Sequence, residues 1–186
     1  MNGFVRAVGR ANEWTGRVAG LFIVGVVLII LREVVGRSVF NAPSVWADEG
    51  MTYLAGLAYA LGGGYTLLHR KHVLVDLVYQ PIARRGGATK AAFDIAGFVL
   101  FAMYCLTLIW FGWKLGSESF AVHEGSGTLW NPPVWPLKLA IPLAGLLLLL
   151  QGIANLLIDL GLARPYATEP DRPIEPTGPA EGSDGR

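Results

Sequence analysis

The side chains that could carry chemistry are few, and they stand at the ends of long apolar runs. Asp48 and Glu49 are adjacent, His69 and His72 are three residues apart, and His123 stands alone. A b-type haem needs axial histidines that face one another, commonly from two helices. His69 and His72 share one helix end, so a haem anchor of an oxidoreductase is only an alternative interpretation.

Other possible sites are weaker. Glu118, His123 and Glu124 fall in one glycine-containing loop without the ligand spacing of a metal site. The triplet at 62–64 lacks the Lys-Ser or Lys-Thr of a phosphate-binding loop. Cys105 is the single cysteine, which excludes an intrachain disulfide. We therefore predict no catalytic residue, no cofactor and no metal, and hence a protein that is not an enzyme.

The composition is that of a membrane protein. Of 186 residues, 53% are hydrophobic and 16% are charged, and the mean hydropathy is +0.45. Soluble domains average ~25% charged residues. The net charge is +1 and the basic residues are scattered over several loops, so nucleic-acid binding is not expected.

Four apolar runs predict four transmembrane helices, at about 18–40, 46–68, 91–116 and 135–160. The uncharged part of the second run is 19 residues long, close to the ~20 that cross a bilayer. The first uncharged run, 18–31, is shorter, so its helix must continue through Arg32, Glu33 and Arg37. Glu33 and Arg37 are four apart and can form an ion pair on one face.

The segments outside the spans complete the predicted architecture, an all-α integral membrane protein. Residues 1–17 carry three arginines, with Phe4, Val8, Ala11 and Trp14 spaced for a short amphipathic helix at the membrane surface. The transmembrane domain is 18–162, and the proline-rich, acidic segment 163–186 is expected to be a disordered cytoplasmic tail. Eleven basic residues fall on the side of the termini and four on the other, which predicts both termini in the cytoplasm.

The second predicted helix has a face suited to close packing. Glu49, Tyr53, Gly56, Ala60 and Gly64 follow one another at spacings of three and four, and small residues at that spacing let helices approach closely. Its acidic residues could stabilise the helix N-terminus, with Ser44 as the N-cap, or Glu49 could bond to a partner subunit.

The last predicted helix carries two amides inside its apolar run. Gln151 and Asn155 are four residues apart, which places both on one face near the middle of the predicted span. Amides at that depth usually bond to a neighbouring helix, so we expect one or both to do so here.

Several short motifs resemble the small membrane subunit of tripartite ATP-independent periplasmic (TRAP) transporters, the DctQ-like family. They are Arg37-Ser38-Val39-Phe40, Trp46-Ala47-Asp48-Glu49, His72-Val73-Leu74-Val75-Asp76 and Ile141-Pro142-Leu143. The resemblance covers about residues 30–160 and carries over Trp46, Glu49, His72 and Asp76 as pattern positions. Together with the small-residue face, these are our candidates for the subunit interface.

The resemblance implies a bacterial inner-membrane transport system with three parts. A periplasmic binding protein delivers an organic anion, expected to be a carboxylate, to a large multi-span subunit driven by a sodium gradient. The small subunit, embedded in the lipid bilayer, acts as a scaffold beside the large one. Apart from the haem anchor, the other alternative is a stand-alone membrane assembly protein.

Overall fold

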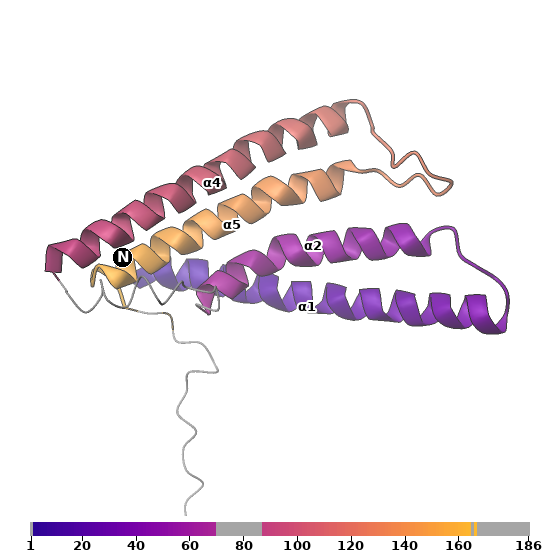
Figure 1. Ribbon diagram of the computed structural model, residues 1–186, viewed down its shortest axis with the longest axis horizontal. Helices are drawn as coiled ribbons and strands as arrows, with labels where there is room; N and C mark the ends of the chain where they lie inside the picture. The colour runs from indigo at the N-terminus through magenta and orange to yellow at the C-terminus, as the bar shows by residue number, and fades with distance from the viewer. Residues whose placement is uncertain (1, 70–86, 165, 167–186) are drawn as a thin grey trace, which may run out of the picture.

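A computed structural model describes residues 2–69, 87–164 and 166 of the chain. The described part contains four helices: α1 (Asn2–Val39), α2 (Ala47–Leu68), α4 (Gly87–Ala121) and α5 (Trp135–Asp159). They form two antiparallel hairpins, α1 with α2 and α4 with α5, which diverge toward their connecting turns (Figure 1). α5 packs against all three other helices, whereas α4 packs against α5 alone. The all-helical class is confirmed.

Three of these helices are long and apolar enough to cross a membrane: Asn2–Val39, Ile95–Ala121 and Trp135–Asp159. α2 has 22 residues, which is sufficient length, but its four glycines between 56 and 64 and its three tyrosines lower the hydropathy. α2 lies between α1 and α5, both of which meet the criterion. That α2 crosses the membrane, and therefore that the chain has four spans, stays a prediction.

The N-terminal segment is part of a longer element. α1 is one helix of 38 residues, so residues 2–17 continue into the first predicted span without a break. Val5 and Val8 are 1% and 7% exposed and form a core with Ala154 of α5. Trp14, from the face predicted to lie on the membrane, is 67% exposed. The surface position of this segment stays a prediction, but one of its faces is covered by α5.

Glycines bring α4 and α5 into contact. A Cβ built on Gly112 would lie 2.8 Å from Cδ and 3.0 Å from the backbone nitrogen of Pro142, and one on Gly116 would lie 2.5 Å from Leu139 Cδ2. Gly112 and Gly116 form a G-x-x-x-G pair, which allows close backbone approach in membrane helices. Pro142 is buried inside α5 at this contact. The atoms of α5 that lie closest to α4 therefore include ring and backbone atoms of Pro142, which cannot rotate away.

This contact predicts that Gly112→Ala destabilises the protein by about 1–3 kcal/mol, the usual cost of overpacking. The added methyl group meets a proline ring rather than a flexible side chain, so relief requires α4 and α5 to separate. Thermal unfolding in detergent would measure the change. Gly97→Ala is the matched control, because nothing lies within 4 Å of its Cβ position; equal stability of the two variants would contradict the packing argument.

Candidate subunit-interaction site

Three of the predicted interface residues hold α2 against the loop between α4 and α5. The rings of Trp46 and Trp130 have centroids 6.5 Å apart. Ser126 Oγ donates to Glu49 Oε1 at 3.1 Å, and the Tyr53 hydroxyl donates to the carbonyl of Pro133 at 3.1 Å. These side chains therefore have partners within this chain. Glu49 Oε2, by contrast, is buried without a hydrogen-bond partner among the described residues.

The loop itself is closed by polar contacts at its base. The Lys138 ammonium donates to the Glu124 carboxylate, and the Val134 N–H donates to the Glu124 carbonyl at 3.0 Å. At the tip, the Gly127 N–H donates to Asn131 Oδ1 at 3.0 Å, with Gly127 at a φ of 75° that favours glycine. The Lys138 hydrogen bond holds the pKa of the Glu124 carboxyl below its ordinary value of 4.5.

A pH-dependent contribution to stability follows from this pair. A carboxyl whose pKa is lowered by folding stabilises the folded state above its ordinary pKa, and this contribution is lost as the pH falls through the lowered value. We expect wild type to have a higher melting temperature than Glu124→Gln above pH ~5, with the difference shrinking as the pH falls below the ordinary pKa of the carboxyl and through its lowered value. The exposed neighbour Glu118 supplies the control Glu118→Gln. A difference that persisted at the lowest pH would refute this account.

A second polar cluster joins α1 to the turn before α2. Glu33 is 6% exposed and accepts from Arg37 at 3.1 Å and from the Ser44 N–H at 3.2 Å. The predicted Glu33–Arg37 pair is thus confirmed. Ser44 is not the N-cap of α2, because its hydroxyl donates to Glu33; Trp46 holds the cap position without a side-chain bond. Arg32 lies over the Trp46 ring, 5.4 Å from its centroid.

The small-residue face of α2 packs inside the chain. A Cβ on Gly56 would lie 2.7 Å from Leu137 Cδ1 of α5, and one on Gly64 would lie 2.0 Å from Asn12 Oδ1 of α1. Ala60 is half-buried. The close helix approach expected from the spacing is therefore made within this chain, and contact of this face with another subunit stays a prediction. His72 and Asp76 lie outside the described residues.

An amide network links three helices toward the end of the bundle where α1 begins. Asn12 Nδ2 donates to Gln151 Oε1 at 2.9 Å, Gln151 Nε2 donates to Asn155 Oδ1 at 3.0 Å, and Asn155 Nδ2 donates to the Leu67 carbonyl at 3.2 Å. Bonding of Gln151 and Asn155 to neighbouring helices is confirmed. Asn12 was not predicted, although its spacing from Val5 and Val8 places all three on one helix face.

The network predicts an interhelical coupling that a double-mutant cycle can measure. For Asn12→Ala and Gln151→Ala, singly and together, we expect a coupling of about 0.6 kcal/mol and no more than ~1.7, the range found for side-chain hydrogen bonds between membrane helices. Thr107→Ala combined with Gln151→Ala is the control, because the Thr107 hydroxyl donates to Met103 of its own helix. A coupling no larger than in this control would contradict the proposed bond.

The histidines that the structure describes lie at opposite ends of the bundle. His69 follows α2, stacks on Tyr65 with ring centroids 4.2 Å apart, and its Nδ1 lies 3.1 Å from the Tyr65 carbonyl oxygen. His123 lies in the loop after α4, with its ring 6.2 Å from that of Phe120. A haem held between helices needs two histidines that face each other, and these two do not.

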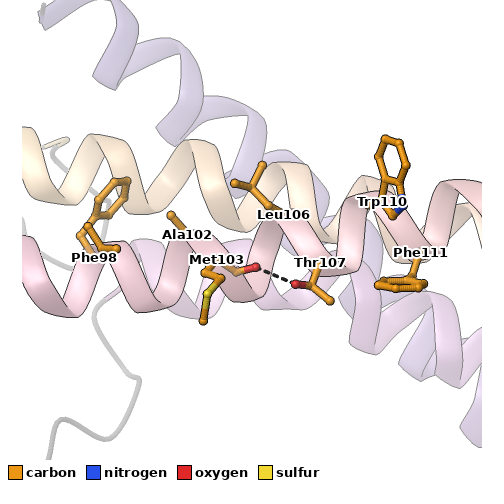
Figure 2. A pocket seen from close by; sticks show the side chains of 8 residues that line it. Phe98, Ala102, Met103, Leu106, Thr107, Trp110 and Phe111 are labelled. Carbon is orange, nitrogen blue, oxygen red and sulfur yellow. Dashed lines mark hydrogen bonds between the residues drawn. The ribbon is translucent and has the colours of Figure 1, made fainter.

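The outward face of α4 carries an apolar groove of about 590 Å³. Figure 2 shows Phe98, Leu106, Trp110 and their neighbours along one side of the helix, where the hydroxyl of Thr107 is already bonded to its own backbone. Apart from the Trp110 indole N–H and this bonded hydroxyl, the side chains that line the groove offer only apolar contacts. It suits an acyl chain or an apolar helix.

The apolar lengths of α1, α4 and α5 and their packing define a multi-span helical membrane protein. A family model, described as "Tripartite ATP-independent periplasmic transporters, DctQ component", matches residues 26–161. The chain belongs to the DctQ family of TRAP transporter components. The matched region runs from the apolar part of α1 to the end of α5. A search among curated proteins found no match.

Proposed function

We propose that this chain is the scaffolding membrane subunit of a TRAP system that imports an organic anion, a carboxylate in our expectation, using a sodium gradient. The observation that carries this proposal is the family match over 26–161, which includes the whole of α2, α4 and α5. In such a system the partners are a large membrane subunit and a periplasmic binding protein.

The packing of the described residues supports a scaffolding role. Four polar side chains of α2 and α5 bond to other segments of the chain: Glu49 and Tyr53 to the loop between α4 and α5, and Gln151 and Asn155 to α1 and α2. Contacts between segments distant in sequence hold the helices in one arrangement. A protein with this organisation can present constant surfaces to a moving partner.

The topology proposed for the inner membrane has four spans and cytoplasmic termini. α2 has 22 residues and lies between α1 and α5, so it can cross together with them. The excess of basic residues on the side of the termini supports their cytoplasmic location. The turn before α2 and the loop between α4 and α5 would then face the periplasm, where a binding protein can reach Trp130 and Leu129, which is 92% exposed.

Purification of the tagged chain from its native membrane in mild detergent tests the proposal. We expect a large multi-span protein to be recovered with it in a constant ratio. Recovery of a flavin or iron–sulfur protein would favour the haem-anchor alternative, and recovery of the chain alone would favour the assembly protein.

Two neighbouring carboxylates sharpen this test. Glu49→Gln should reduce uptake or assembly more than Asp48→Gln, because Glu49 bonds to the outer loop and keeps one buried oxygen without a partner, whereas Asp48 is exposed. Uptake measured in cells lacking the native chain would compare the two variants directly. Equal uptake would remove Glu49 from the set of functionally important residues.

A further inference from the structure

Contacts between the helices define which residues share one level of the bundle. The ring of Tyr65 in α2 covers Gly16 of α1, where a built Cβ would lie 2.3 Å from Cδ2. The preceding residue, Gly64, has its Cβ position 3.4 Å from Leu147 Cβ of α5. Residues 16 and 17 of α1 therefore stand level with Leu147 of α5.

That level is the middle of the apolar part of α4 and α5. Leu147 lies eleven residues from Ile158, the last residue of the uncharged run in α5, which is about 16 Å at 1.5 Å per residue. Nearby, the Cβ position of Gly145 is 3.2 Å from the Cys105 carbonyl, in the centre of the apolar run of α4. If α4 and α5 cross the bilayer, Arg17 stands near its midplane, and the end of the segment 1–17 enters the membrane instead of lying on its surface.

Two arginines, Arg10 and Arg17, are exposed on the surface of α1 at and below this level, with the partly buried Glu13 between them. We call Arg10, Glu13 and Arg17 the polar stripe; they are one turn or two apart along the helix. The Arg17 side chain is 67% exposed and is paired with Glu13 at 3.4 Å. Arg10 is exposed and has no bonding partner among the residues that the structure describes.

The stripe contrasts with the rest of the exposed surface of α1. From Leu21 to Leu31 this surface is aliphatic: Leu21, Val24 and Leu28 are 70%, 55% and 60% exposed. Such side chains suit lipid, whereas exposed charges at that depth are costly and mark functional or partner-facing positions. The apolar part of α1 therefore begins level with the middle of the apolar runs of α4 and α5. The polar stripe occupies the part of α1 that lies beside the remaining half of those runs.

We propose that the polar stripe is the contact surface for the large membrane subunit, which presents a carboxylate and other hydrogen-bond acceptors to it at mid-depth. This inference rests on the proposed function. Two arginines and one glutamate give the stripe a net positive charge, which an acidic or acceptor-rich helix complements. A protein helix can hold such groups at the level of Arg17, whereas lipid phosphates lie at the membrane surface, about 16 Å from Arg17 along the helix.

Collision measurements with a nitroxide label on Gly20→Cys in the reconstituted complex test this contact. Gly20 is exposed, lies one turn beyond Arg17, and has nothing within 4 Å of its Cβ position, while the native Cys105 is 0% exposed and protected from labelling. We expect the label to be shielded from both oxygen and a water-soluble nickel chelate. Gly3→Cys, whose Cβ position is equally open, is the control and should collide with the nickel chelate.

The outcomes separate the possible surroundings of the stripe. Collision with oxygen alone at residue 20 would place it in lipid, and collision with the nickel chelate would place it in water or headgroups; either result overturns the inference. A preparation in which wild type retains no large subunit would overturn the proposed function instead.

Charge-neutral variants provide the second arm. Glu13→Gln/Arg17→Gln removes both members of the pair and leaves the net charge of the chain unchanged, and we expect it to lower recovery of the large subunit at least tenfold. Arg6→Gln, at the end of α1 where Arg6 bonds to the Asn2 carbonyl, should change recovery less than twofold. Full recovery with the double variant, beside normal recovery with wild type, would contradict the inference.

Discussion

The close approach of helix backbones at glycines is the constraint on which the rest of this structure depends. Within a bilayer, helices gain little from the hydrophobic effect by associating, so dispersion contacts at short range must hold them together. Gly56 and Gly64 of α2 and Gly112 of α4 each face a side chain that leaves no room for a methyl group. Because α5 contacts each of the other described helices, these close contacts fix the positions of the helices and of their polar side chains relative to one another.

Polar contacts then secure the two ends of the bundle. At the end of the bundle that carries the turns, Glu33 accepts hydrogen bonds from Arg37 and Ser44, and Glu49 accepts one from the loop between α4 and α5. Toward the other end, Asn12 and Gln151 bond across α1 and α5. The Glu49–Ser126 and Asn12–Gln151 bonds join segments that are far apart in the chain, so they restrict the relative movement of whole helices. This is the property that a scaffold beside a transporting subunit needs.

The two hairpins differ in the surfaces they offer to their surroundings. α4 presents an apolar groove whose one hydroxyl, Thr107, is satisfied by its own backbone (Figure 2). α1 presents charged side chains at the level where α4 and α5 are most apolar. The difference arises because the apolar part of α1 is displaced along the bundle relative to that of α5, while glycine contacts through α2 fix their register. One side of the subunit thus suits lipid and the other suits a polar partner.

The sequence by itself determined what depends on local spacing. Apolar run lengths gave the helices, and a four-residue separation gave the Glu33–Arg37 pair and the shared face of Gln151 and Asn155. Short motifs also indicated the family, since they record local patterns. The sequence also predicts that α2 crosses the membrane, but α2 is not among the three helices apolar enough to do so by composition, because its glycines serve packing at the expense of hydropathy.

Only the tertiary structure decided which distant residues meet. Asn12 bonds to Gln151 across 139 positions of sequence, and Ser44 bonds to Glu33 instead of capping α2. Nor could spacing reveal that Gly56 packs against Leu137 of the same chain, or that Arg17 stands level with Leu147. The register between two helices depends on which large side chain packs against each glycine of the neighbouring helix. That pairing depends in turn on how all the helices pack together.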